Sequence, residues 1–268
     1  MIPRTLTIAG SDPSGGAGVQ ADLKTFTVMG TYGMAVITAL TAQNTQGVTG
    51  VRAVELAFVR KQMKAVLDDI ETDAVKTGML WNKRTVMIVA KSMEEAKLGA
   101  PLVVDPVMIA KGGAPLLAED AVSTVVDLLF PRAAVITPNT HEASLLTGIK
   151  IRTGDDMEKA AEALLKMGPK SVFLKGGHTE GDRCDDLFTD GDTVTWLRGK
   201  RLDQKHTHGT GCTLSAAIAA CLAKGRDAID ACSEAKRFVT GAILNAYPIG
   251  KGVGPVNHVW EKSAPVSN

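Results

Sequence analysis

Apolar stretches of strand length alternate along this chain with longer segments in which apolar residues recur at helical spacing. Parallel strands need long crossover connections, usually helices, so this alternation is typical of an α/β fold. It predicts a three-layer sandwich in which helices flank a mostly parallel central sheet. The predicted strands span residues 5–9, 34–40, 72–78, 100–106, 133–138 and 171–177, and the predicted helices span 18–30, 57–70, 83–97, 120–130, 156–168, 212–224 and 228–246.

The pattern changes in the last third of the chain. After about residue 183 the sequence alternates over 185–197 and contains Asp190-Gly191, a dipeptide favoured in hairpin turns. A small hairpin region is therefore expected there, before the two final helices. We find no internal repeat and no linker-like segment, so residues 1–268 are expected to form a single domain whose tail frays after about residue 262.

Charge and cysteine content exclude several classes of protein. The formal net charge is +1 and the basic residues are scattered, so neither nucleic acid nor an anionic membrane is an expected partner. No apolar run approaches the ~20 residues of a membrane span. The four cysteines form no CxxC pair and no leader peptide is expected, so we predict reduced thiols in a cytoplasmic protein.

Polar residues and glycines follow most of the predicted strands. Such residues at or just beyond a strand's carboxyl end are Gly10, Gln43, Asp105, Asn139 and Lys175. In open α/β sheets, ligands bind in the crevice beyond these ends. Loops after strands are polar in any case, but their coincidence at several strands predicts a binding site.

Two common nucleotide-binding motifs are absent or incomplete. Gly16, Gly18 and Ala21 match a dinucleotide fingerprint, but no acidic residue ends the next predicted strand, where a ribose hydroxyl would need one. The chain also contains no G-x-x-x-x-G-K-[ST] segment. These observations argue against a dinucleotide-dependent oxidoreductase and exclude a P-loop protein.

Several candidate residues support two interpretations each. Asn139 and Glu142 match a capping box at a helix start, or they could hold a hydrated Mg²⁺, which suits a carboxylate and an amide oxygen. Asp105, at the end of a buried strand, must meet a cation, a donor or solvent. Lys175, beside two glycines, could meet a phosphate or pair with an acidic residue.

The turn at residues 209–212 leads directly into a predicted helix. Backbone N–H groups of Gly209, Thr210, Gly211 and Cys212 at a helix N-terminus form an anion site. A thiol at this position is expected to have a lowered pKa and to act as proton acceptor or nucleophile. The alternative is that Cys212 is only a small packing residue.

With these residues in view, the chain resembles the ribokinase-like superfamily, and within it the hydroxymethylpyrimidine/phosphomethylpyrimidine kinases of thiamine biosynthesis. The resemblance extends in order from about Thr5 to His258. It rests on the segments TIAGSDPSGGAGVQADLKTF, TALTAQNT, KTGML, VVDPVM, TPNTHEA, LKGGH, HGTGCTLSAAIA and GVGPVNH. Eight such segments are more specific than any one of them.

The resemblance implies ATP- and Mg²⁺-dependent phosphorylation of 4-amino-5-hydroxymethyl-2-methylpyrimidine, and then of its monophosphate, by a ribokinase-like homodimer. The residues that it places at the pyrimidine are Gly10, Gln43, Met79 and Val107. It places Lys175, Asn139, Thr210 and Gly211 at ATP, and Asp105, Asn139 and Glu142 at the metal. The turn at residues 209–212 becomes the anion hole for the moving phosphoryl group.

Related sugar kinases carry an aspartate base where this chain has Cys212, and we expect Cys212 to orient and deprotonate the acceptor hydroxyl. A mobile flap around Lys111 is a further expectation. His206 and His208 are expected to face solvent or to support the site from behind. Three alternatives stay open: a pyridoxal or dual-specificity kinase, a cysteine acyl-transfer enzyme using one of these histidines, and a non-catalytic nucleotide-binding protein.

Overall fold

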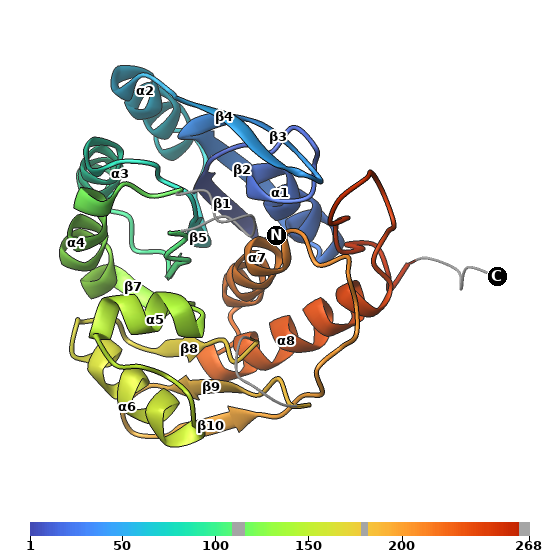
Figure 1. Ribbon diagram of the computed structural model, residues 1–268. Helices are drawn as coiled ribbons and strands as arrows, with labels where there is room; N and C mark the ends of the chain where they lie inside the picture. Colours follow the sequence, from blue (N-terminus) through green and yellow to red (C-terminus); the bar gives the residue numbers. More distant parts are fainter. Residues whose placement is uncertain (109–115, 178–181, 263–268) are drawn as a thin grey trace.

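The computed structural model describes residues 1–108, 116–177 and 182–262 (Figure 1). Within these residues the central sheet has eight strands in the order β10-β9-β8-β7-β6-β5-β1-β2. Their bounds are β1 (Arg4–Ala9), β2 (Tyr32–Ile37), β5 (Ala74–Thr77), β6 (Leu102–Val104), β7 (Ala133–Ile136), β8 (Val172–Leu174), β9 (Asp186–Thr189) and β10 (Val194–Leu197).

The sheet is parallel except at one edge. All neighbouring strands from β2 to β8 are parallel, whereas β9 is antiparallel to β8 and β10 is antiparallel to β9. The β9–β10 hairpin turns at Asp190-Gly191, where Gly191 has a φ of 96°. Both the mostly parallel sheet and the hairpin after residue 183 are confirmed.

Helices cover both faces of the sheet, which confirms the three-layer arrangement (Figure 1). One layer consists of α2 (Leu56–Leu67), α3 (Lys83–Glu95), α4 (Glu119–Leu128), α5 (Thr140–Thr147) and α6 (Gly154–Leu165), with a 3-10 turn at Phe130–Arg132 after α4. The other consists of α1 (Gly18–Val28), α7 (Thr210–Ala223) and α8 (Ala228–Leu244).

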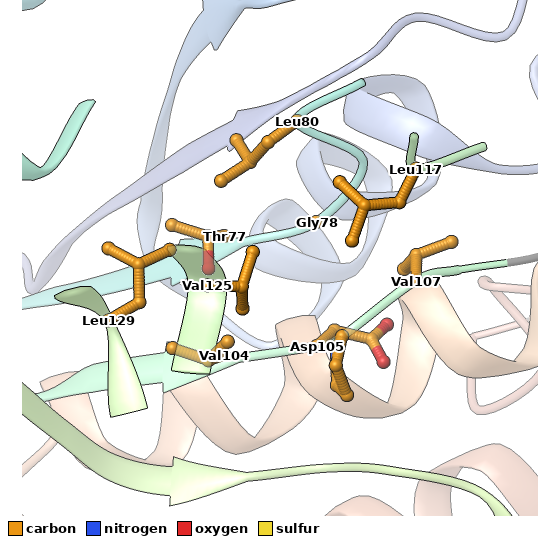
Figure 2. Close-up of a pocket in the computed structure, with 10 residues that line it drawn as sticks. Thr77, Gly78, Leu80, Val104, Asp105, Val107, Leu117, Val125 and Leu129 are labelled. Atoms are coloured by element: carbon orange, nitrogen blue, oxygen red, sulfur yellow. The ribbon is translucent and has the colours of Figure 1, made fainter. Parts of the chain in front are cut away.

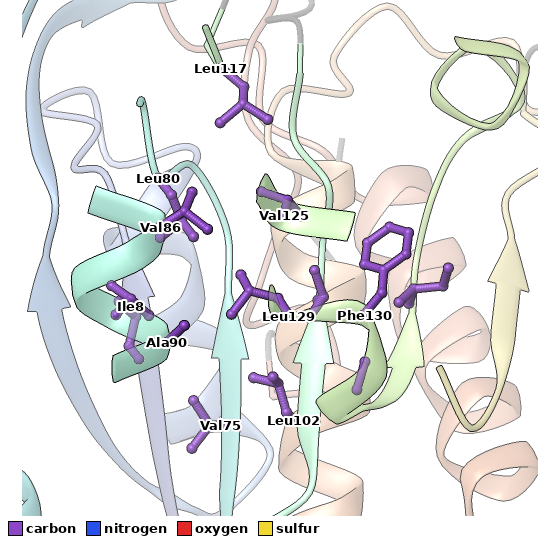
Figure 3. Packing of buried hydrophobic residues seen from close by; sticks show 14 of the residues in the cluster. Ile8, Val75, Leu80, Val86, Ala90, Leu102, Leu117, Val125, Leu129 and Phe130 are labelled. Atoms are coloured by element: carbon purple, nitrogen blue, oxygen red, sulfur yellow. The ribbon is translucent and has the colours of Figure 1, made fainter. Parts of the chain in front are cut away.

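Strand residues divide between two hydrophobic cores because successive side chains point to opposite faces of a sheet. In β6, Leu102 and Val104 pack in the core under α2–α6, while Val103 packs in the core under α1, α7 and α8. Figure 3 shows the first core from close by, with Val75 of β5 and Val86 of α3. Burial on both faces explains why these strands have continuous apolar sequences.

A second, two-stranded sheet was not predicted. The predicted strand 34–40 is wrong at its end, because β2 ends at Ile37 and the chain leaves the main sheet after Thr38, whose N–H makes a last bond to Ala9 O of β1. Beyond it, β3 (Ala39–Asn44) pairs antiparallel with β4 (Gly47–Ala53). β4 was missed because its side chains are exposed or half-buried, so its sequence has no buried stripe.

The remaining differences from the predicted elements are small. Helix ends differ by a few residues, and α5 was anticipated only through the capping box at its start. The predicted flap around Lys111 and the tail after residue 262 lie outside the described residues. Among the described residues, no helix is long and apolar enough to span a membrane.

Candidate functional site

One cluster of predicted residues forms around Asp105, just beyond β6. Asp105 is 3% exposed, and its carboxylate accepts hydrogen bonds from Lys175 Nζ at 3.3 Å, Thr137 Oγ1 at 3.1 Å and Ser215 Oγ at 3.1 Å. Lys175 follows β8, Thr137 follows β7 and Ser215 belongs to α7. The carboxyl ends of three neighbouring strands therefore meet α7 at one carboxylate.

Lys175 is a cation at neutral pH. Burial lowers its pKa, but the carboxylates of Asp105 and Glu142 raise it more, so the pKa of Lys175 lies above its ordinary value. Of the two interpretations of Lys175, the ion pair with an acidic residue is observed. It leaves an ammonium group at the start of α7, which is compatible with a phosphate ligand.

The turn before α7 depends on glycines. Gly209 has a φ of 81°, and a Cβ there would lie 1.7 Å from Gly16 O. The N–H of Thr210 points to Thr207 O at 3.4 Å, so Thr210 contributes less to the predicted anion site than expected. The N–H groups of Gly211 and Cys212 have no hydrogen-bond partner in the described part of the chain. Two helix N-terminal donors therefore remain available to an anion.

Gly211 leaves the space in front of Lys175 open. A Cβ at Gly211 would lie 3.7 Å from Lys175 Nζ and 3.8 Å from Asp105 Oδ2, which are ordinary contact distances. We expect Gly211→Ala to fold, with a stability equal to or about 0.5–1 kcal/mol above the parent, because alanine favours helices. The added methyl group should lower kcat/KM for ATP at least about tenfold by occupying the phosphate position.

Thermal unfolding and steady-state kinetics measure the two effects of Gly211→Ala separately. Gly225→Ala is the control glycine substitution, at a residue that follows α7. Gly225 has a φ of 78°, and a Cβ added there would have no neighbouring atom within 4 Å. It should lose stability through backbone strain and keep its kcat/KM for ATP. Unchanged kcat/KM in Gly211→Ala would contradict an anion site at this turn.

The thiol of Cys212 does not have the lowered pKa that we predicted. Burial raises the pKa of Cys212 to about 11, against the lowering effect of Lys76, and the carboxylates of Asp22 and Asp105 raise it further. The prediction considered only the helix N-terminus. Tertiary packing adds buried carboxylates whose charges oppose ionisation of the thiol.

Asn139 and Glu142 form the capping box that was one of their two interpretations. Asn139 Oδ1 accepts from the Glu142 N–H at 2.9 Å, and Glu142 Oε2 accepts from the Asn139 N–H at 2.8 Å. Burial, and then the nearby charge of Asp105, raise the pKa of Glu142 to about 7 despite Lys175. A buried carboxyl group that is partly protonated beside another carboxylate is a position where a cation would be stabilising.

The raised pKa of Glu142 makes stability depend on pH. An unfolded glutamate titrates near 4.5 and the folded one near 7, so stability is lost as the pH rises from about 4.5 to 7. We expect Glu142→Gln to be more stable than the parent by at least about 1 kcal/mol at pH 8, and the difference to vanish near pH 4. Urea unfolding at both pH values checks this, and equal differences at both would contradict it.

A second cluster contains Gln43, which lies on β3. Gln43 Nε2 is 3.4 Å from His208 Nε2, and His208 Nε2 is 2.8 Å from Asp12 Oδ2. His208 is half-buried, and the side chain of His206 accepts the N–H of Gly254 at 2.9 Å. Both histidines support loops around the strand ends. Of the two expectations for them, the one that they only face solvent is therefore wrong.

Sequence reasoning missed Asp12. Its side chain is 2% exposed. The available signal was a carboxylate directly after the first predicted strand, the position that made Asp105 a candidate.

The other residues predicted to contact the pyrimidine lie near strand ends, but they do not line one common pocket among the described residues. Met79 packs on Gly10, since a Cβ at Gly10 would lie 2.9 Å from Met79 Sδ. Val107 lines a pocket between β5, β6 and α4 with Asp105 (Figure 2). That pocket has a volume of about 10 Å³, room for one water molecule, so it is not itself a place for a pyrimidine ring.

A buried ion pair was also missed. Asp22 of α1 and Lys76 of β5 are both fully buried, and Lys76 Nζ lies 2.8 and 3.0 Å from the two Asp22 oxygens. Burial lowers the pKa of Lys76, but Asp22 and then Cys212 raise it above its ordinary value. The signals were a lysine inside a strand predicted to be buried, and an aspartate three residues after Val19 on the apolar side of a helix.

Comparisons with known proteins find relatives that match nearly the whole chain. The model of the family described as phosphomethylpyrimidine kinase matches residues 12–257. A hydroxymethylpyrimidine/phosphomethylpyrimidine kinase of Streptomyces coelicolor is 50% identical over 258 residues, which are 96% of this chain and 95% of that protein. A thiamine biosynthesis bifunctional protein of Geobacter sulfurreducens is 50% identical over 255 residues, which are 95% of this chain and 52% of that longer protein.

A solved structure shows the same fold. The pyridoxal kinase of Staphylococcus aureus, in complex with AMP-PCP and pyridoxal, matches with a TM-score of 0.89 and 38% identity, over 96% of this chain and 94% of that one. The likeness confirms the predicted ribokinase-like α/β fold. It also shows that a similar chain binds an ATP analogue.

Proposed function

Because the chain belongs to the phosphomethylpyrimidine kinase family, we propose that the residues at the carboxyl ends of its strands transfer the γ-phosphoryl group of ATP to a hydroxymethylpyrimidine. The protein is a kinase of thiamine biosynthesis, and its acceptors are hydroxymethylpyrimidine and the corresponding monophosphate. The assignments of individual residues below are proposals built on the contacts described above.

One observation carries the proposal: the Lys175 ammonium is held on Asp105 in front of the open position at Gly211. Phosphoryl transfer has a loose transition state, so catalysis depends on positioning and on stabilising negative charge. Lys175 and the free N–H groups of Gly211 and Cys212 supply positive charge and donors at one place. They would hold the γ-phosphoryl group while it moves.

At the acceptor, the Gln43 amide both donates and accepts, which suits the amino group and ring nitrogen of an aminopyrimidine. Met79 and Gly10 would contact the ring, with Val107 beyond them. The acceptor oxygen forms a bond to the γ-phosphorus while the bond from that phosphorus to ADP breaks. The hydroxyl proton moves to Sγ of Cys212 in its thiolate form, which becomes the neutral thiol.

The carboxyl groups of Asp105 and Glu142, with Asn139 Oδ1, fit a hydrated Mg²⁺. The described residues contain no cluster of three or more His, Cys, Asp or Glu that would enclose a metal, so water must supply most ligands, as Mg²⁺ prefers. The raised pKa of Glu142 beside Asp105 supports a cation there. Mg²⁺ would neutralise phosphate charge, while Asn139 and Glu142 keep their capping contacts.

The role of Cys212 is tested by its pH dependence. The pKa of about 11 means that the thiolate fraction rises with pH through the neutral range, so kcat should rise between pH 6.5 and about 9. We expect Cys212→Ala to lower kcat about 10²-fold, and Cys212→Ser to keep more activity because a hydroxyl can still orient the acceptor. Near-full activity of both variants with the parental pH profile would leave only an anion hole.

One assay tests the range of acceptors that the site uses. ATP consumption with Mg²⁺ is measured with hydroxymethylpyrimidine, with its monophosphate and with pyridoxal. We expect turnover with the first two, and silence with both would contradict the proposed site. Turnover with pyridoxal alone would identify a pyridoxal kinase, the alternative favoured by the Staphylococcus aureus structure, and turnover with all three a dual-specificity enzyme.

Three further predictions concern the domain organisation, the oligomeric state and the location of the protein. We propose that residues 1–268 form a single kinase domain, that two copies form a homodimer, and that the protein works in the cytoplasm. Sedimentation velocity measures the oligomeric state directly, and a monomer at micromolar concentration would contradict the dimer. Limited proteolysis that yields two stable fragments would contradict the single domain.

A further inference from the structure

Asp12 and His208 have no part in the phosphoryl transfer described above, although His208 lies next to Gln43, the residue placed at the acceptor, and Asp12 lies next to His208. We propose that they are positioning residues which set the orientation of the Gln43 amide, and thereby the order of donor and acceptor that the substrate meets. The inference rests on the proposed function, which places Gln43 at the aminopyrimidine edge.

Asp12 is surrounded by donors and is therefore a carboxylate. Its Oδ1 accepts the N–H of Ser14 at 2.9 Å and the Ser14 hydroxyl at 2.7 Å. Its Oδ2 accepts the N–H groups of Gly16 at 3.2 Å and Ala17 at 2.8 Å. Burial raises the pKa of Asp12, but His208 and these donors together bring it below its ordinary value.

A carboxylate can only accept, so His208 must donate to it. The atom that faces Asp12 Oδ2 at 2.8 Å is His208 Nε2. Nε2 consequently carries a hydrogen, and this fixes the state of the imidazole on the side that faces Gln43. That one hydrogen is directed at Asp12, and the Gln43 amide lies 3.4 Å from the same nitrogen, so this side of the ring favours an amide oxygen, which can share the N–H, over a second donor.

Thr41 imposes the same orientation from the other end of the amide. Its hydroxyl lies 2.9 Å from Ser11 O and 3.3 Å from Gln43 Oε1. A hydroxyl has one hydrogen, and a carbonyl oxygen can only accept, so the Thr41 hydrogen belongs to Ser11 O. The Thr41 oxygen can then only accept from Gln43.

Both neighbours are satisfied when the Gln43 amide is rotated by half a turn, with its NH₂ group toward Thr41 and its oxygen toward His208. The opposite orientation sets Nε2 of Gln43 against the N–H of His208 at 3.4 Å, donor against donor. It also sets two acceptors against each other at Thr41. The charge of Asp12, relayed by His208, therefore selects one of two orientations that have the same shape.

Both the backbone and the ring of His208 are held in place, as a positioning group must be. The backbone N–H of His208 donates to Gly254 O at 3.0 Å, and the backbone N–H of Val256 donates to the carbonyl oxygen of His208 at 3.2 Å. A Cβ at Gly16 would lie 2.3 Å from His208 Cδ2, so the ring packs directly on that loop. Segments from both ends of the chain thus fix one side chain.

The selected orientation determines which substrates fit. One N–H of Gln43 faces Thr41 and one oxygen lone pair faces His208, which leaves one N–H and one lone pair for the ligand. They form an ordered donor–acceptor edge that matches a ring nitrogen beside an exocyclic amine in one order only. A heterocycle with the reverse order, or with an acceptor only, loses a contact at this edge.

A double-mutant cycle tests whether His208 acts through Gln43. We expect His208→Leu and Gln43→Ala each to raise KM for hydroxymethylpyrimidine about tenfold, with KM for ATP unchanged. The double variant should show no more than the Gln43→Ala effect, because both changes remove the same oriented amide. An increase of about 10²-fold, the product of the single effects, would overturn the inference.

A conservative variant separates orientation from simple packing. His208→Gln places an amide N–H near the position of Nε2, so its KM for the pyrimidine should return to within about threefold of the parent. Thermal unfolding is measured for each variant. A His208→Gln enzyme with the same raised KM as His208→Leu would show that the imidazole only fills space.

Nitrogen-15 NMR of the free protein tests the network without any acceptor. The imidazole signals lost in His208→Gln belong to His208, and we expect them to report a hydrogen on Nε2. A hydrogen on Nδ1 alone would overturn the inference even in an active enzyme. If the parent phosphorylates neither pyrimidine, the proposed function fails, and the NMR result still decides the orientation of the network.

Discussion

Lys76→Met should lower the free energy of unfolding by about 3–5 kcal/mol, because burial already raises the pKa of Asp22 and the change leaves this carboxyl group in the core without its cation, so that it must take up a proton or remain as an uncompensated charge. Both side chains of the pair are fully buried. The only other contact to that carboxylate is the hydrogen bond from Thr7 Oγ1 at 2.6 Å, among the contacts of the described residues. Urea unfolding at pH 7 measures the loss.

Two controls show that burial causes the effect. Lys64→Met makes the same substitution in an exposed ion pair, that of Lys64 with Asp68, and should change stability by less than about 1 kcal/mol. The double variant Asp22→Asn/Lys76→Met removes both charges and should recover much of the loss. A loss below about 1 kcal/mol in Lys76→Met would contradict a buried, structurally required ion pair.

Lys76→Met also tests the surroundings of Cys212. The positive charge of Lys76 lowers the pKa of the Cys212 thiol, against the larger effect of burial. Its removal should therefore raise that pKa further and shift the rise of kcat to higher pH. The ultraviolet absorbance of the thiolate, measured in a Cys184→Ser background, checks the direction of this shift.

Lys175→Met should lower kcat/KM for ATP about 10³-fold, because it removes the only charged donor that contacts Asp105 at the proposed phosphate position among the described residues. Asp105 would keep the hydroxyl groups of Thr137 and Ser215. Initial rates over a range of ATP concentrations, with hydroxymethylpyrimidine as acceptor, measure the loss.

Lys175→Arg is the matched variant, since it keeps the charge and changes its shape. We expect it to recover part of the activity, because a guanidinium can still reach a phosphate but meets Asp105 differently. Lys170→Met removes a lysine before β8 and should leave kcat/KM unchanged. A loss of less than about tenfold in Lys175→Met would contradict its proposed place at the phosphates.

Much of the fold could be predicted because buried strands and helices require apolar residues in runs or at regular spacing along the chain. The continuous apolar run that includes Leu102–Val104 marked a strand covered on both faces, and Asp190-Gly191 marked the hairpin at the sheet edge. The exposed β4 has no such apolar pattern, and the apolar run 34–40 continues without interruption through Thr38, where β2 ends and β3 begins. Both were therefore missed.

The candidate site divides in the same way. Asp105, Asn139 and Lys175 could be found because parallel strands bring their carboxyl ends to one edge. The pKa predicted for Cys212 was wrong because it is raised first by burial and then by carboxylates of α1 and the end of β6, whereas its sequence neighbours are only glycine and threonine. The pairing of Asp12 with His208, 196 residues apart, has no signal in local spacing.

The sequence by itself determined the alternation of strands and helices, the family, and the glycines that the turn before α7 requires. Only the tertiary structure decided which charges face each other and which of them are buried. The physical reason is that propensity and periodicity act between residues close along the chain. Electrostatic energy depends on distance through space and on exclusion of water, which the folded packing alone sets.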